Sequence, residues 1–366
     1  MRIVSTSYSK TEDFDNPAEW LKRINFYSGI LRELATQHEV TSIERINYEG
    51  THEQDGVCYH FIKLNKTVVR FPFKMHRLIK DLRPDVVLIN GLIFPMQVIQ
   101  LHFAVGRKAK IIVLHRAERP FTGIKKYLQK LADRYVHAYL FTSFDFSPLW
   151  KNNIDTRKIF EVIQASSGFE PINKPEAKRM TGVTGEPVFL WVGRLDENKD
   201  PLTVIHSFLQ YLDTQPLAKL YMIFQEDKLL PQIKSIVNAG KWKVGSIILI
   251  GKIANQQMQS WYSSADFIIS GSHYEGSGVA VTEAMSCGCI PIVTDIPSFR
   301  NMMGRGKCGF LYKPSDQGQL LKLLMETKEI DLEAEKGRVL AQFKNELSFV
   351  AVAEKIDHII KLQKKI

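Results

Sequence analysis

Short apolar runs that alternate with amphipathic segments constrain the fold of this chain more than any other feature. Residues 85–90 and 110–114 are apolar runs of the kind that parallel sheets bury on both faces. The alternation stops at residues 165–185, which are rich in Gly, Pro, Ser and Lys, and then starts again. A chain of 366 residues is long enough for two domains. The pattern therefore predicts an α/β protein with two doubly wound, Rossmann-like parallel sheets.

The periodicity also places the individual elements. We expect strands at residues 2–7, 40–43, 59–62, 85–90 and 110–114, and later at 188–192, 219–224, 246–250, 266–270 and 290–293. We expect helices at residues 16–36, 74–82, 94–105 and 123–137, and later at 201–213, 228–239, 255–264, 279–286 and 331–345. A last helix at 349–366 has no strand after it, so its apolar face, with Ile356, Ile359 and Ile360, must pack on a domain that already exists.

Composition excludes several classes of protein. Hydrophobic residues make up 45% and charged residues 24%, as in folded proteins rather than disordered or collagen-like ones. No apolar run reaches the roughly 18 residues of a membrane-spanning helix, and the N-terminus lacks the apolar stretch of a signal peptide. The four cysteines lack metal-ligand spacing. We therefore expect a cytoplasmic protein with reduced thiols.

The net charge of +10 is concentrated in one stretch of the chain. Residues 51–150 contain 16 Lys and Arg against seven Asp and Glu, whereas the rest is nearly balanced. Such a concentration suits a phosphate-bearing substrate, an anionic lipid surface or nucleic acid. Nucleic acid is the weakest of the three, because no zinc-finger, RNA-binding or helix-turn-helix signature accompanies the charge.

Ligands of doubly wound sheets bind at the carboxyl ends of strands, so the loops after the strands hold the candidate site. The loop after residues 188–192 begins with Gly193, which permits a tight turn, and contains Arg194 and Lys199. A guanidinium can bind two phosphate oxygens, and an ammonium adds a point charge. Taken alone, this loop is better explained as a solvated loop whose cations pair with Asp196 and Glu197.

The loop after residues 266–270 carries a stronger signal. Five residues lead directly into a helix: Glu275, Gly276, Ser277, Gly278 and Val279. The free N–H groups at the start of that helix form an anion site suited to a diphosphate. Glu275 and Glu283 are placed to accept hydrogen bonds from sugar or ribose hydroxyls. The alternative is an ordinary helix N-terminus with acidic neighbours, but the two cations of the preceding loop favour a nucleotide-diphosphate site.

Two segments, FLWVGRLDENKD and the run from LIGKIANQQ to KCGFLYK, contain these loops, and Glu275 and Glu283 stand in E-x7-E spacing. Over residues 189–313 the chain resembles the retaining nucleotide-sugar glycosyltransferases of the GT-B fold, family 4, also called group 1. LSFVAVAEKI resembles the closing helix of that fold. The resemblance implies an N-terminal acceptor-binding domain at 1–165, a C-terminal donor-binding domain at 166–346, and a helix at 347–366 that crosses back to the first domain.

The resemblance also implies roles for individual residues. Arg194 and Lys199 match the pair that binds the donor diphosphate and stabilises the leaving group. Glu275 matches the glutamate that faces the donor sugar, and Glu283 matches the one that holds the ribose. The other implied donor-binding positions surround the sugar, the phosphates and the nucleobase: Gly193, Lys252, Ile253, Gly276, Ser277, Gly278 and Val279.

The first half of the chain matches the family more weakly. His115, after the expected strand at 110–114, matches the histidine beside the donor sugar and is the fourth catalytic candidate, with Glu275, Arg194 and Lys199. The alternative is a strand-end histidine bonded to the backbone. Residues 7–11, the loop after the first strand, lack the Gly-Gly pair that is frequent in the family. We therefore assign no donor contact to that loop.

The implied reaction moves a sugar from a UDP- or GDP-sugar to an acceptor hydroxyl with retention at the anomeric carbon, in cell-surface polysaccharide or glycolipid biosynthesis. Two cations and a helix N-terminus can stabilise the departing diphosphate, so we expect neither a metal nor a cofactor. No acidic pair of the DxD type follows a strand in the donor half. Two alternatives stay open: a nucleotide-sugar epimerase of the same fold and a non-catalytic nucleotide-sugar binding module.

The expected partners are the nucleotide-sugar donor and a glycan or lipid-linked acceptor, without nucleic acid. The basic segment 107–134 overlaps the expected helix at 123–137, in which Tyr127, Leu128 and Leu131 lie beside three lysines. In one interpretation this helix contacts the inner face of an anionic membrane. In the other, its apolar residues belong to the core and its lysines are solvated.

Overall fold

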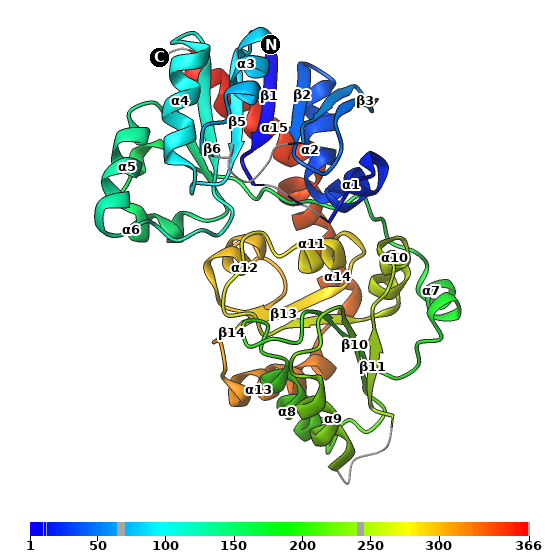
Figure 1. The fold of residues 1–366 in the computed structure, drawn as a ribbon. Helices are drawn as coiled ribbons and strands as arrows, with labels where there is room; N and C mark the ends of the chain where they lie inside the picture. Colours follow the sequence, from blue (N-terminus) through cyan, green and yellow to red (C-terminus); the bar gives the residue numbers. More distant parts are fainter. Residues whose placement is uncertain (10, 12, 64–69, 240–244, 365–366) are drawn as a thin grey trace. The chain divides into compact units, whose positions relative to one another are not determined.

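The computed structural model describes residues 1–9, 11, 13–63, 70–239 and 245–364, and the chain divides into two compact units. The first unit joins Met1–Ser166 with the C-terminal Phe349–Ile366, and the second is Ser167–Ser348. Each unit is built around its own largely parallel sheet with helices on both faces (Figure 1). The α/β class with two Rossmann-like sheets is therefore confirmed.

The sheet of the first unit has the order β3-β4-β2-β1-β5-β6-β7-β8. Its strands are β1 (Arg2–Ser7), β2 (Glu39–Glu44), β3 (Gly50–Gln54), β4 (Val57–Phe61), β5 (Val86–Asn90), β6 (Lys110–Leu114), β7 (Ala138–Phe141) and β8 (Ile159–Glu161). Neighbouring strands run parallel except in the β3–β4 hairpin. The chain order reverses between β1 and β5, so the loops after these strands open at the switch point of the sheet.

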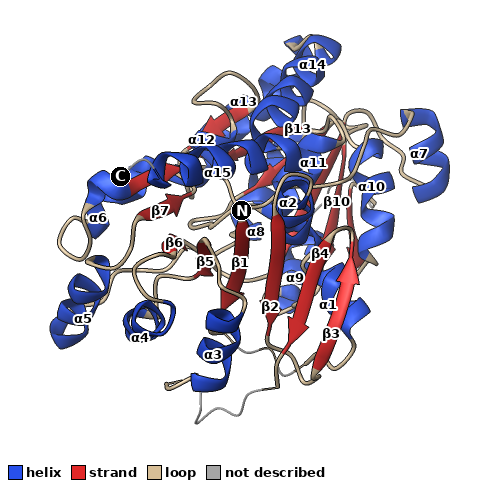
Figure 2. Ribbon diagram, turned by 90° about the horizontal axis from the view of Figure 1, so that it is seen from above, coloured by secondary structure: helices blue, strands red, loops and turns tan. Residues whose placement is uncertain are grey.

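Helices cover both faces of this sheet. They are α1 (Pro17–Arg23), α2 (Asn25–Ala35), α3 (Phe73–Asp81), α4 (Pro95–Val105), α5 (Gly123–Asp133), α6 (Ser147–Trp150) and α15 (Phe349–Lys364). On one face α2 packs against α15, and on the other α4 lies between α3 and α5 (Figure 2). Short 3₁₀ turns occupy Phe144–Phe146 and Thr156–Lys158.

The C-terminal helix α15 completes the core of the first unit. Ile356, Ile359 and Ile360 are buried, as its apolar periodicity predicts. The ring of Phe349 lies so close to Gly29 in α2 that a Cβ there would be 2.4 Å from it. A side-chain pair adds to the contact, because His38 Nε2 lies 2.8 Å from Asp357 Oδ1. The closing helix thus returns to the first unit, as the resemblance implies.

The sheet of the second unit has the order β11-β10-β9-β12-β13-β14, with all described neighbours parallel. Its strands are β9 (Val188–Gly193), β10 (Lys219–Phe224), β11 (Ile247–Gly251), β12 (Phe267–Ser270), β13 (Ile290–Thr294) and β14 (Phe310–Tyr312). Its helices are α7 (Lys174–Thr181), α8 (Pro201–Tyr211), α9 (Leu230–Ala239), α10 (Asn255–Ser264), α11 (Val279–Ser286), α12 (Pro297–Met302), α13 (Gln317–Glu326) and α14 (Leu332–Gln342). Thr327–Glu329 is a 3₁₀ turn, and Phe343–Leu347 is a π turn.

The structure corrects several expected elements. The helix expected at 16–36 is two helices, because Ile24 leaves the helical region (φ −96°, ψ 12°) where its side chain enters the core. Residues 165–185 are not simply a linker, since they contain α7, which packs on α10 and ends at the left-handed Gly182. The helix expected at 123–137 ends at Asp133. The short elements β3, β7, β8, β14, α6 and α12 are additional, as is the longer helix α13.

Two further sequence expectations concern cysteines and membrane spans. All four cysteines are free thiols, and three of them are buried. Within the part of the chain that the structure describes, no helix has the length and apolar character needed to cross a membrane.

Candidate active site

The candidate site lies at the carboxyl edge of the second sheet, where the strand order reverses. β12 pairs directly with β9, with Ile269 opposite Trp191, although two strands, β10 and β11, lie between them in chain order. The loops that follow these two strands are therefore neighbours, as expected at the switch point of an open parallel sheet. They touch at Gly271, where a Cβ would lie 2.7 Å from the carbonyl oxygen of Asp200. Only glycine allows this close approach.

The loop after β9 presents its cations on a tight turn. Arg194 Nε lies 3.1 Å from Asp196 Oδ2, and half of the Arg194 side chain is exposed. Asp196 also accepts a hydrogen bond from the Lys199 backbone N–H at 2.9 Å. Asp196 therefore closes the turn and orients Arg194. The alternative interpretation of this loop, in which its cations pair with its own acidic residues, is correct for Arg194.

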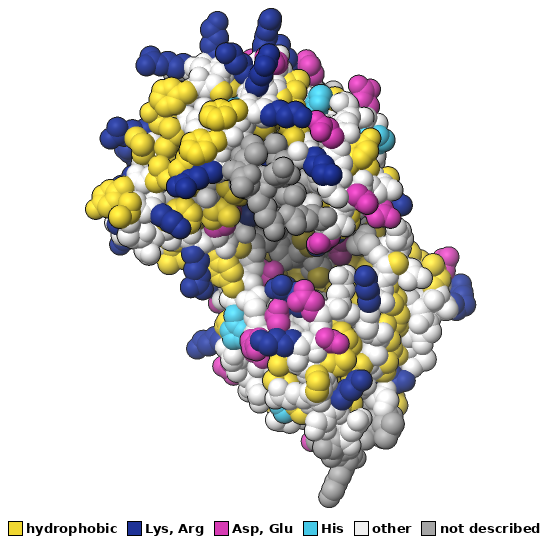
Figure 3. Space-filling view, viewed as in Figure 1, with side chains coloured by type: hydrophobic (Ala, Val, Ile, Leu, Met, Phe, Trp, Pro, Cys, Tyr) yellow, Lys and Arg dark blue, Asp and Glu magenta, His cyan; other side chains and the backbone are white. Residues whose placement is uncertain are grey.

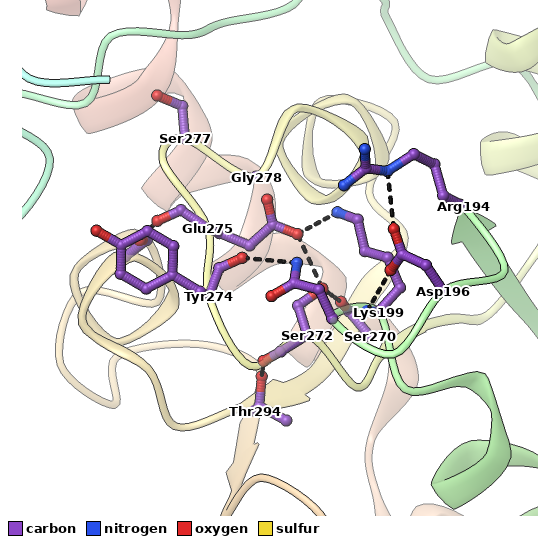
Figure 4. Close-up of polar contacts among 12 residues, drawn as sticks. Arg194, Asp196, Lys199, Ser270, Ser272, Tyr274, Glu275, Ser277, Gly278 and Thr294 are labelled. Atoms are coloured by element: carbon purple, nitrogen blue, oxygen red, sulfur yellow. Dashed lines mark hydrogen bonds and ion pairs between the residues drawn. The ribbon is translucent and has the colours of Figure 1, made fainter. Parts of the chain in front are cut away.

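Lys199 makes a different contact, which links the two loops. Its ammonium donates to Glu275 Oε1, and Ser272 Oγ donates to the same oxygen at 2.8 Å. The Lys199 and Glu275 side chains are only 21% and 14% exposed. Figure 4 shows Arg194 and Lys199 pointing toward the same space, with the Glu275 carboxylate facing them from the other loop.

Backbone contacts hold the loop after β12 in place. Thr294 Oγ1 donates to the carbonyl of Ser272 at 2.5 Å, and Ser298 Oγ donates to the carbonyl of Glu275. Asn198 Nδ2 donates to the carbonyl of Tyr274 at 3.1 Å. Because these partners come from β13, α12 and the neighbouring loop, the position of Glu275 is fixed by tertiary contacts rather than by its own segment.

The same loop ends in a helix start that no side chain caps. Gly278 is the N-cap residue of α11 in the left-handed conformation (φ 52°), and no side chain caps the helix. A Cβ on Gly278 would lie 2.6 Å from the ring of Phe299. The amides at Val279 and Ala280, together with the helix dipole, form an anion-binding N-terminus next to the Glu275 loop.

Glu283 and the 252–253 pair lie elsewhere in the second unit. Tyr262 of α10 donates to Glu283 Oε2 at 2.9 Å, and Asn255 Nδ2 lies 3.4 Å from Oε1. Lys252 is exposed and Ile253 is half-buried, directly after β11. The structure therefore brings Arg194, Lys199 and the Glu275 loop together, whereas Glu283 is held against α10.

His115 lies in the first unit, at the end of β6. It is buried, its ring stacks on Phe141 with centroids 4.4 Å apart, and Nε2 donates to the carbonyl of Glu118 at 2.9 Å. Burial lowers the pKa of His115 to about 4, so the ring is neutral at pH 7. These contacts match the alternative of a strand-end histidine bonded to the backbone; its catalytic role stays a prediction.

A polar network around His115 escaped the sequence analysis. Glu118 accepts hydrogen bonds from the backbone N–H of Arg116 at 2.6 Å and of Leu92 at 3.0 Å, and so ties the loops after β5 and β6 together. Arg116 Nε donates to Asn90 at 3.1 Å. The only sequence signal was the position of these residues after predicted strands.

Tyr8 lies in the loop after β1, which lacks the Gly-Gly pair. Its side chain is buried and its hydroxyl lies 3.0 Å from His76 Nε2. Lys10 of the same loop lies outside the described residues. The loop after β1 thus begins with a tyrosine whose ring is buried against His76.

Two further features bear on the location of the site. A cavity of about 730 Å³ is lined by Lys174, Lys178 and Asp266 among others. Asp266 immediately precedes β12, so this cavity lies at the amino end of the strands, away from the loops described above.

Among the described residues, no group of three or more His, Cys, Asp or Glu side chains forms a metal-binding cluster.

Part of the chain is similar in sequence to known glycosyltransferases. Residues 173–338 match the family model of the glycosyl transferases group 1. Mannosylfructose-phosphate synthase of Agrobacterium fabrum is 27% identical over 139 residues, which cover 36% of this chain and 31% of that protein. GDP-mannose:cellobiosyl-diphosphopolyprenol alpha-mannosyltransferase of Xanthomonas campestris is 30% identical over 110 residues, covering 30% and 29%. The chain thus spans about a third of the length of these relatives.

Solved structures match along the whole chain. A glycosyltransferase from Rickettsia africae superposes with a TM-score of 0.75 at 16% identity, covering 100% of this chain and 98% of that one. Anabaena HepE, solved with UDP, gives 0.75 at 14% identity with 99% and 100% coverage. Sucrose-phosphate synthase from Thermosynechococcus elongatus gives 0.72 at 13% identity with complete coverage of both chains. These similarities establish the predicted GT-B fold.

Proposed function

We propose that this chain is a retaining glycosyltransferase that moves a sugar from a UDP- or GDP-sugar to an acceptor hydroxyl. The proposal rests on the contact of Lys199 with Glu275 beside the uncapped N-terminus of α11. The family match at 173–338 covers these residues. Solved structures of the same fold include Anabaena HepE in complex with UDP-glucose.

The chemistry follows from the charges of the site. Cleavage of a glycosyl–phosphate bond leaves negative charge on the diphosphate, and fixed cations and helix N–H groups stabilise such charge. Arg194 and Lys199 are paired with Asp196 and Glu275 when no donor is bound. A bound diphosphate pairs with these two cations in place of the two carboxylates. The Glu275 carboxylate can then accept hydrogen bonds from hydroxyls of the donor sugar. Binding of the donor thus replaces one set of ion pairs by another and leaves no buried cation unpaired.

Retention is proposed to come from attack on the face that the diphosphate leaves. A diphosphate oxygen takes the proton of the incoming acceptor hydroxyl as the glycosyl–phosphate bond breaks, so no covalent enzyme intermediate forms. In this scheme Glu283 holds the ribose after exchanging its bonds with Tyr262 and Asn255. The backbone at Lys252 and Ile253 meets the nucleobase, and the proposed catalytic role of His115 rests on the family resemblance. Neither a metal nor a cofactor takes part.

The acceptor is proposed to be a glycan or a lipid-linked sugar of cell-surface polysaccharide or glycolipid synthesis. The first unit receives it, and the enzyme works in the cytoplasm. The similarity to a mannosyltransferase named for a diphosphopolyprenol acceptor supports this choice of acceptor class.

A release assay tests the proposal. The chain is incubated with UDP- and GDP-sugars, with and without lipid-linked or glycan acceptors and with a chelator, and free nucleoside diphosphate is measured. We expect release that requires acceptor and persists with the chelator. A strict requirement for Mg²⁺ or Mn²⁺ would contradict the metal-free scheme. Acceptor-independent conversion of the nucleotide sugar would indicate an epimerase, and tight binding without turnover a binding module.

A further inference from the structure

The helix α5 has its apolar face turned away from the protein. Ile124, Tyr127 and Leu131 follow one stripe of the helix, yet these residues are 89%, 70% and 40% exposed, while Leu128 beside them is half-buried. The buried positions of α5 are Gln129 and Ala132. An amphipathic helix on a protein surface normally does the reverse and buries its apolar stripe.

The inner face of α5 is fixed by polar contacts. Gln129 Oε1 accepts hydrogen bonds from the backbone N–H of Phe121 at 2.9 Å and from Asn153 Nδ2 at 2.6 Å. Gln129 Nε2 donates to the carbonyl of Leu92 at 3.2 Å. Because these bonds fix the rotation of the helix about its axis, the apolar stripe is not free to turn inward.

The exposed stripe continues onto α4. Phe103, which is 71% exposed, meets Tyr135 just after the end of α5, with ring centroids 5.7 Å apart. Figure 3 shows hydrophobic side chains interspersed with lysines and arginines over this part of the first unit. Apolar residues that gather in this way and are rimmed by charge mark an interaction surface.

The charges around the stripe are mostly positive. Residues 107–134 contain nine Lys and Arg but only two acidic residues, Glu118 and Asp133. Glu118 is occupied by backbone N–H groups, and Asp133 pairs with Lys158 at 3.4 Å. The exposed cations include Arg107, Lys108, Lys125, Lys130 and Arg134. Within residues 107–134, the stripe is therefore bordered by positive charge that Glu118 and Asp133 do not balance.

We propose that this stripe, Phe103, Ile124, Tyr127 and Leu131, docks the protein on an anionic lipid bilayer. A basic helix with aromatic and aliphatic residues on its apolar face is suited to the interface of a membrane, where tyrosine is also favoured. A protein partner fits less well, because lysine is depleted at protein interfaces. The proposal goes beyond the transfer reaction and does not depend on it.

Vesicle flotation of the full chain tests the docking directly. We expect binding to phosphatidylcholine vesicles that contain phosphatidylglycerol, no binding to pure phosphatidylcholine, and weaker binding as salt is raised. Each surface lysine contributes about a fivefold factor to partitioning, so K125Q/K126Q/K130Q should bind about 100-fold more weakly. The matched control K234Q/K307Q/K344Q changes three lysines of the second unit and should bind nearly normally.

A second pair of variants tests the apolar part. I124S/Y127S should weaken vesicle binding about tenfold without changing the thermal midpoint, because both side chains are exposed. The control M180S/L217S removes two exposed apolar side chains from the second unit. Absence of flotation with anionic vesicles at low salt would overturn the proposal, as would equal effects of the α5 and control variants. Self-association that I124S/Y127S abolishes, without vesicle binding, would show instead that the stripe is a protein interface.

Discussion

Single residues at the carboxyl edge of the second sheet decide how charge is distributed in the candidate site. Lys199 and Glu275 come from different loops, are mostly buried, and pair with each other. Arg194 is half exposed and pairs within its own loop. Lys199 is therefore tied to the site by tertiary contacts, whereas Arg194 can reorient at little cost.

Removal of either cation is the direct test of the proposed leaving-group stabilisation. Loss of one donor to a developing anion costs about 10²–10³ in rate, so Arg194→Ala and Lys199→Ala should each lose about that much turnover. Lys228→Ala, which removes an exposed lysine paired with Glu197, is the control and should remain active. Steady-state kinetics measure the effect, and thermal unfolding confirms folding. Near-normal turnover of Arg194→Ala would place the donor elsewhere.

The buried His115 predicts a pH-dependent stability. Its pKa is about 4 in the folded protein and about 6.5 when unfolded, so the unfolded chain takes up the proton first as the pH falls. The native state should therefore lose stability below about pH 6.5, by about 2 kcal/mol at pH 5. His115→Phe, which keeps a ring against Phe141, should show a smaller loss between pH 7.5 and 5. An unchanged pH dependence, equal to that of the exposed control His358→Phe, would refute the assignment.

At the scale of elements, glycines set how closely the loops of the second sheet approach. The carbonyl oxygen of Asp200 lies 2.7 Å from where a Cβ of residue 271 would be, and the ring of Phe299 lies 2.6 Å from where a Cβ of residue 278 would be. In both places a side chain would push apart the segments that form the site.

Gly271→Ala should therefore weaken both stability and the site. Overpacking against a backbone atom costs about 1–3 kcal/mol and would displace the β9 loop that carries Lys199, so nucleotide affinity should fall as well. Gly337→Ala is the matched control: this exposed glycine lies within α14 with no atom nearby, and alanine should stabilise the helix by about 1 kcal/mol. Calorimetric unfolding and titration with UDP or GDP measure the two effects. Unchanged stability and affinity of Gly271→Ala would contradict this account.

At the scale of the whole molecule, the chain ends in the unit where it began. α15 buries Ile356, Ile359 and Ile360 against a core that also contains Ile30, Leu31 and Leu34 of α2. The first unit is thus incomplete until the last residues of the chain are in place.

Ile356→Ala should destabilise the first unit by about 2–5 kcal/mol, because it leaves a cavity between α15 and α2. Val350→Ala, at an exposed position of the same helix, should change stability by less than about 0.5 kcal/mol. Hydrogen exchange locates the effect: amides of α2 and β2 should lose protection in Ile356→Ala, while those of β9 and β12 should not. Equal loss of protection in both units would show that α15 stabilises more than the first unit.

The sequence by itself determined the two parallel sheets, the return of the last helix and the loops that carry the candidate site. Buried parallel strands have continuous apolar runs, and a helix without a following strand must bury its apolar face on an existing core. The glycines and charged residues directly after these runs identify the loops, because ligands meet such sheets at their carboxyl edges.

Only the tertiary structure decided which residues meet and which faces stay exposed. The pairing of Lys199 with Glu275 depends on β9 and β12 being neighbours, which is a property of strand order rather than of spacing along the chain. The network of Arg116 and Glu118 joins loops that follow different strands. The periodicity of α5 is the same whether its apolar stripe faces the core or solvent. Its orientation was settled by the hydrogen bonds of Gln129, which join residues far apart in sequence.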